Sequence, residues 1–118
     1  MAALMRLAVA SKDGVSVSEH FGHAKRFAVY EVGPGHCLLL EARQVEHYCL
    51  GNASSQSAMA GILEAIKDCQ AVFVAKIGDG PTEKLAALGV AAVSAYAWEP
   101  IEDALLDYAR RLHGEATP

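Results

Sequence analysis

The stretch FAVYEVGPGHCLLLEARQVEH, residues 27–47, decides how this chain folds. Residues 27–32 and 36–47 are rich in residues that favour strands, and the Gly-Pro-Gly sequence at 33–35 between them favours a turn. Two strands with a three-residue connection predict a β-hairpin. We therefore expect segment 27–32 to run antiparallel to both of its neighbours in the sheet.

The remainder of the chain predicts three short buried strands and three helices. Pro81 is expected at the first position of the second helix and Gly89 just past its end. Pro100 is expected to open the third helix, and Gly114 can close it. The predicted strands are residues 6–10, 71–75 and 90–96, and the predicted helices lie within residues 54–69, 78–89 and 99–114.

The order of these elements predicts an α/β fold. Strands joined through helices should be parallel, with right-handed crossovers, whereas the hairpin is antiparallel. A mixed five-stranded sheet of strand order 3-2-1-4-5, flanked by helices, follows from this. With 118 residues the chain is long enough for one domain and too short for two ordinary ones, so residues 1–118 are expected to form a single domain.

The composition excludes several classes of protein. Hydrophobic residues make up 53% of the chain, which is enough for a packed core. No apolar run reaches the ~18 residues that span a bilayer, and no signal peptide is evident, so we expect a cytoplasmic protein away from membranes. The net charge of −4 argues against a nucleic-acid binder. The cysteines form no C-x-x-C pair, which argues against a structural zinc site and fits free thiols in a reducing compartment.

Side chains suited to metal binding follow the predicted strands at one edge of the sheet. Ligands of open α/β sheets favour the edge where the parallel strands have their carboxyl ends. Imidazole and thiolate together suit zinc, copper or an iron–sulfur cluster better than magnesium or calcium. The candidate side chains at this edge are His20, His23, His47, Cys49 and Lys76.

Spacing alone leaves an ordinary structural role open for each of these residues. A loop histidine is usually polar surface, and a lone cysteine is usually a small buried hydrophobe. The chain contains neither a G-x-S-x-G nor an H-E-x-x-H motif. Three functions are compatible with the His and Cys side chains at this edge. They are a non-catalytic cluster carrier, a small zinc-type or other single-metal enzyme, and a regulatory or interaction module.

Three stretches of the chain stand out together: RLAVASKDG followed by VSEHFGHAKRFAVYEV, then VEHYCLGN, then AVFVAKIGDGPTEKLAALGV. They resemble the dinitrogenase iron-molybdenum cofactor-binding family, which includes NifX-like carriers and the carboxyl-terminal domain of the NifB cofactor-maturation protein. The resemblance covers about residues 6–112, the expected core, and implies a ribonuclease-H-like fold without nuclease chemistry. It implies that the chain binds an iron–sulfur precursor or the finished iron-molybdenum cofactor as cargo and passes it between cofactor-assembly proteins. The C-x3-C-x2-C triad of radical-SAM domains is absent, so the chain is not expected to build clusters itself.

The resemblance also ranks the candidate ligands. His20 aligns with the histidine of the family's HFG motif and is the first candidate. Phe21 can pin the loop into the core, which would present His20 at a lower entropic cost than His23. The other expected contributors are two further ligand candidates, His47 and Cys49, and three cations that would offset the charge of an anionic cluster, Lys25, Arg26 and Lys76.

Overall fold

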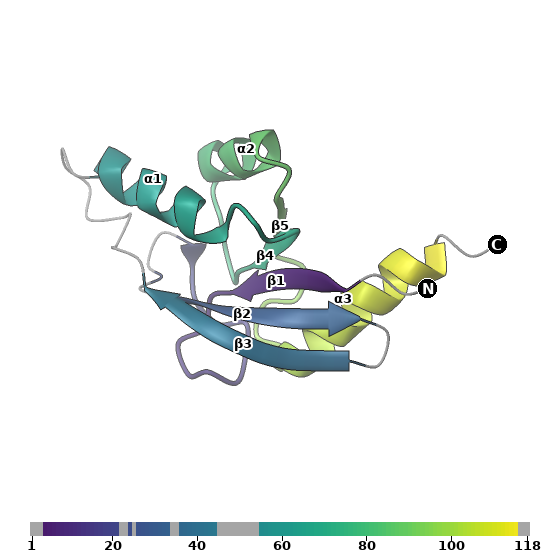
Figure 1. Ribbon diagram of the computed structural model, residues 1–118. Coiled ribbons are helices and arrows are strands. Elements are labelled where there is room, and N and C mark those ends of the chain that lie inside the picture. The colour runs from purple at the N-terminus through teal and green to yellow at the C-terminus, as the bar shows by residue number, and fades with distance from the viewer. Residues whose placement is uncertain (1–3, 22–23, 25, 34–35, 45–54, 116–118) are drawn as a thin grey trace.

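Five strands form one mixed sheet in the computed structural model, which describes residues 4–21, 24, 26–33, 36–44 and 55–115 (Figure 1). Their order is β3-β2-β1-β4-β5, which confirms the predicted strand order and the α/β fold class. β2 runs antiparallel to β1 and β3, whereas β4 runs parallel to β1 and β5. The strands are β1 (Met5–Val9), β2 (Arg26–Gly33), β3 (His36–Gln44), β4 (Ala71–Phe73) and β5 (Ala91–Val93).

Helices cover both faces of the sheet. α1 (Ser55–Ile66) and α2 (Asp79–Ala87) lie over one face, and α3 (Ile101–Glu115) lies over the other (Figure 1). Because successive side chains of a strand point to opposite faces, β1 contributes to both cores. Ala8 packs in the core under α1 and α2, and Leu7 packs in the core under α3. This double burial explains why the part of β1 that follows Arg6, residues 7–9, is a continuous apolar run.

Beyond the end of β4, successive backbone amides donate hydrogen bonds to different segments of the chain. β4 ends at Phe73 and not at residue 75 as predicted, and β5 covers residues 91–93 instead of 90–96. The amide of Val74 still donates to the carbonyl of Val93 at 3.0 Å, but the amide of Ala75 donates to the carbonyl of Glu19 at 2.9 Å. The chain beyond β4 therefore pairs with the loop that follows β1.

The predicted start of the second helix is wrong by two residues, and the predicted end of the third helix is wrong by one. α2 begins at Asp79, so Pro81 is its third residue; the first turn accepts a proline because its N–H groups lack helical partners. Gly89 follows α2 with a φ of 82°, as expected for a residue just past a helix end. α3 starts directly after Pro100, as predicted, but continues through Gly114, because glycine permits an end to a helix without imposing one.

A charge network joins β3, β1 and the turn after α1. The guanidinium of Arg43 donates to Asp68 at 2.6 Å and to the carbonyl of Ala65 at 2.6 Å, and Arg6 donates to Asp68 at 2.9 Å. The hydrogen bond from Arg43 is the largest of the effects that lower the pKa of Asp68 to about 2, from an ordinary value of 3.8. The ionised carboxylate of Asp68 therefore stabilises the folded state.

Replacing Asp68 with asparagine should reduce the pH dependence of stability. The folded-state pKa is depressed, so the contribution of Asp68 is present above about pH 4 and is lost as the pH falls through about 2. Because the side chain is 39% exposed, solvent screening limits the loss at neutral pH to about 1 kcal/mol. Urea unfolding at each pH should show the difference between Asp68→Asn and the parent protein shrinking towards pH 2. Glu64→Gln, on the surface of α1, is the matched control; an equal pH effect there would contradict the assignment.

Candidate functional site

The loop after β1 is held against the segment that follows β4 by backbone hydrogen bonds. The amide of Glu19 donates to the carbonyl of Ala10 at 3.2 Å, and the amide of Ala75 donates to the carbonyl of Glu19 at 2.9 Å. The amide of Phe21 donates to the carbonyl of Lys76 at 2.9 Å. His20 lies between these bonds and forms a parallel bridge with Lys76. The structure therefore brings together two predicted site residues that are far apart in the sequence.

Phe21 anchors this loop in the core. Its side chain is 1% exposed, and its ring lies 6.0 Å from the ring of Phe27 between centroids. Ala24 is also buried. His20 is half-buried, so its position is constrained while part of its surface faces solvent. This agrees with the expectation that Phe21 holds the loop in place.

The outer part of the same loop is organised by Asp13. Its carboxylate accepts hydrogen bonds from the amides of Val15 and Ser16, both at 2.9 Å. The backbone hydrogen bonds from Ser16 and Val15 lower the pKa of Asp13 to about 2. The amide of Trp98 in turn donates to the carbonyl of Val17 at 2.8 Å, which ties the loop to the segment before α3. The loop is therefore supported on two sides.

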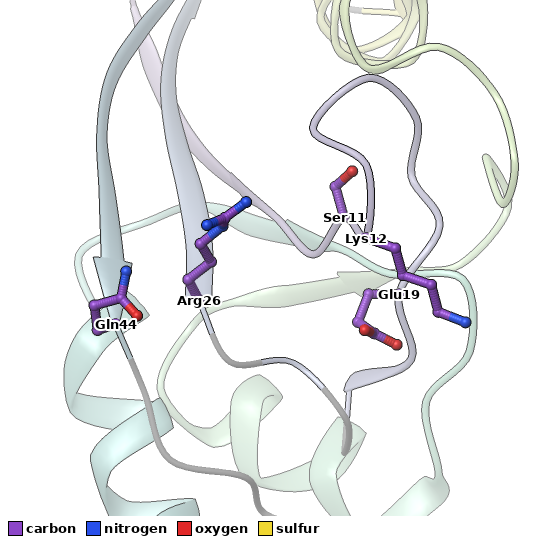
Figure 2. Close-up of a pocket in the computed structure, with 5 residues that line it drawn as sticks. All are labelled: Ser11, Lys12, Glu19, Arg26 and Gln44. Carbon is purple, nitrogen blue, oxygen red and sulfur yellow. The ribbon is translucent and has the colours of Figure 1, made fainter.

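A polar pocket of about 320 Å³ lies at the predicted edge of the sheet. Arg26, the first residue of β2, pairs directly with Gln44, the last residue of β3, and both lie on the strand side of the pocket (Figure 2). The other lining residues come from the loop after β1. Hereafter "the polar pocket" means the hollow lined by Ser11, Lys12, Glu19, Arg26 and Gln44.

Sequence reasoning singled out Arg26 and missed the other four lining residues of the polar pocket. Ser11 and Lys12 directly follow the first predicted strand, so their position at its carboxyl end could have identified them. Gln44 could not be placed without the register, because a β-bulge shifts the pairing of β2 and β3 between Val29 and Tyr30.

The cations of the described residues divide into two groups. Those of the first group, which includes Arg6 and Arg43, form ion pairs with carboxylates. Within the residues that the structure describes, no side-chain ion pair is found for Lys12, Arg26, Lys76 or Lys84. Lys12 and Arg26 line the polar pocket, and Lys76 lies beside His20. This edge of the sheet therefore carries positive charges that form no ion pair with a described carboxylate.

Four of the predicted site residues fall outside the described part of the chain. They are His23, Lys25, His47 and Cys49. Among the residues whose placement is described, no three His, Cys, Asp or Glu side chains gather closely enough to hold a metal ion. The site residues that the structure places are thus His20, Arg26 and Lys76.

Neither thiol in the described residues belongs to this site. Cys69 is buried, and burial raises its pKa to about 11, so it stays protonated and unreactive at neutral pH. Cys37 is half-buried near the opposite end of β3, and burial, followed by the charge of Glu102, raises its pKa.

Within the same described residues, none of the helices has the length and apolar character needed to cross a membrane.

Comparisons with known proteins agree on one family. The family model described as dinitrogenase iron-molybdenum cofactor matches residues 4–111. The chain is 38% identical over 109 residues to the FeMo cofactor biosynthesis protein NifB of Azotobacter vinelandii, covering 90% of this chain and 22% of that protein. It is 40% identical over 102 residues to the protein of the same name from Herbaspirillum seropedicae, covering 86% of this chain and 19% of the relative. The chain therefore spans about a fifth of the length of these relatives.

A solved structure shows the same fold. The crystal structure of PH0822 superposes with a TM-score of 0.66 and covers 89% of each chain, at 22% sequence identity. At that identity the likeness concerns the arrangement of strands and helices.

Proposed function

Because the chain belongs to the dinitrogenase iron-molybdenum cofactor family, we propose that it is a carrier that binds an iron–sulfur cofactor or its precursor during FeMo cofactor biosynthesis. In this proposal the chain acts as a single domain and catalyses no reaction on its cargo. It would take the cluster from one cofactor-assembly protein and deliver it to another, in the cytoplasm, with no nucleic acid or membrane involved.

The observation that carries the proposal is the bridge between His20 and Lys76 at a positively charged edge. Iron sites of such clusters accept imidazole or thiolate ligands, and the cluster as a whole is anionic. His20 is held by the backbone bonds on both sides of it, which lowers the entropic cost of using its imidazole as a ligand. Arg26 and Lys76 would offset part of the cluster's charge.

Further ligands are proposed from two segments that directly follow residues of this site in the sequence. His23 and Lys25 come directly after the anchored part of the loop, and His47 and Cys49 follow Gln44 of the polar pocket. We propose His23, His47 and Cys49 as secondary ligands and Lys25 as a further cation. A carrier needs few ligands, because each additional bond to the cluster slows its release.

Anaerobic titration with isolated iron-molybdenum cofactor tests this function. Binding is expected to change the visible absorption and the electron paramagnetic resonance signal of the cluster, saturating at a fixed ratio of cluster to protein. Protein purified in air is expected to be colourless, because oxygen destroys an exposed cluster. Stoichiometric zinc without an iron-dependent chromophore would instead favour a single-metal enzyme, and no uptake of any metal would favour a regulatory module.

A further inference from the structure

We infer that the polar pocket binds a small organic carboxylate that also carries a hydrogen-bond donor, either a hydroxyl or an ammonium group. This inference goes beyond the proposed cluster-carrying role, because the ligand it names is a free small molecule and not the cluster. It rests on the charges, the hydrogen bonds and the size of the pocket.

Two cations line the pocket from opposite sides. Arg26 lies on the strand side and Lys12 on the loop side (Figure 2). Within the described residues neither forms a side-chain ion pair, in contrast to Arg6 and Arg43 on the same sheet. A guanidinium binds a carboxylate with two parallel hydrogen bonds, and an ammonium adds a further donor. The pocket is therefore suited to an anionic oxygen ligand.

Glu19 makes the pocket selective among anions. Its carboxylate accepts the amide of His20 at 2.9 Å, and its own amide and carbonyl are both hydrogen-bonded, so the side chain projects from a fixed backbone. An ionised carboxylate can only accept hydrogen bonds, and it has capacity beyond the one that His20 uses. A ligand that offers only carboxylates would meet repulsion at Glu19. A hydroxyl or ammonium group on the ligand would donate to it instead.

The size of the pocket points to an organic acid instead of a single inorganic oxyanion. Its volume of about 320 Å³ is at the lower end of the range of small-molecule sites, roughly 300–1,000 Å³. Ser11 and Gln44 add neutral polar groups to the lining. A compact dicarboxylate with one hydroxyl or ammonium group has a carboxylate for each cation and a donor for Glu19.

Calorimetric titration with four probes tests this inference: L-malate, L-aspartate, succinate and inorganic phosphate. Malate carries the hydroxyl, aspartate carries the ammonium, and succinate lacks both. We expect malate or aspartate to bind at least roughly tenfold more tightly than succinate, because one hydrogen bond to a charged group is gained. They should also bind more tightly than phosphate, which has no second anionic group for the other cation. Whichever of the two binds more tightly identifies the donor that Glu19 accepts. Equal affinity for malate, aspartate and succinate, or no binding of any probe at millimolar concentration, would overturn the inference.

Variants locate the binding within the pocket. Arg26→Gln and Lys12→Gln are each expected to weaken binding of the preferred probe by roughly tenfold, with unchanged melting temperatures. Glu19→Ala is expected to remove the preference over succinate. Lys84→Gln on α2 is the control, since Lys84 is also exposed and also lacks an ion pair among the described residues. If it weakens binding as much as Arg26→Gln, the attraction is diffuse and the inference fails.

No cluster is present in these titrations, so their failure is distinguishable from failure of the carrier proposal. A chain that binds cluster but none of the small acids keeps the proposed function and loses this inference. A chain that binds malate or aspartate with the expected selectivity but no cluster keeps the inference and loses the carrier role.

Discussion

Replacing Phe21 with alanine is expected to lower the free energy of unfolding by about 3–5 kcal/mol, the usual cost of removing a buried aromatic ring. Phe21 is 1% exposed and packs against Phe27 in the core shared with α1 and α2. The same change should weaken cluster binding, because the loop would hold His20 less firmly. Urea unfolding measures the first effect, and anaerobic cluster titration at a temperature where the variant stays folded measures the second.

Two control variants separate the anchoring of the loop from general loss of apolar surface. Phe21→Leu keeps most of the buried volume and should lose much less stability than Phe21→Ala. Leu39→Ala removes an exposed side chain from the edge strand β3 and should change stability by about 0.5 kcal/mol or less. A loss below about 1 kcal/mol for Phe21→Ala would mean that the ring does not anchor the loop.

Replacing His20 with alanine is expected to reduce the affinity for the cluster by at least about tenfold to a hundredfold, because loss of a ligand should cost no less than loss of a residue that only orients a ligand. The fold should be retained, because the backbone bonds around His20 involve the amides of Ala75 and Phe21 and do not depend on its side chain. The measurements are the melting temperature and then an anaerobic titration followed by visible absorption.

His36 provides the matched control for this histidine. It is exposed at the start of β3, far from the candidate site along the strand, and pairs with Glu31 at 3.0 Å. His36→Ala should bind cluster like the parent protein. His23→Ala, His47→Ala and Cys49→Ala then rank the secondary ligands, with His23 expected to matter less than His20. A folded His20→Ala variant that binds cluster as tightly as the parent would show that His20 is not a ligand.

Part of the candidate site could be predicted from residue types and from the positions of strand ends. His20 and Lys76 were singled out because they follow predicted strands, and Arg26 because its charge would offset that of the cluster the resemblance implies; the structure places all three at one edge of the sheet. The involvement of Glu19 was missed, because nothing in its spacing distinguishes it from other polar loop residues; Lys12 was missed although it directly follows the first predicted strand. Their placement depends on how the loop folds back over the sheet.

The sequence by itself determined the order of the elements and the topology of the sheet. A Gly-Pro-Gly turn between two β-rich segments specifies an antiparallel hairpin, and apolar runs separated by helices specify parallel strands; both are local signals. Only the tertiary structure decided that β4 ends at Phe73 and that the chain beyond it pairs with Glu19 and Phe21. Backbone amides and carbonyls are the same in every residue, so their partners are set by which segments the packed core brings side by side, and not by the identity of the residues that carry them.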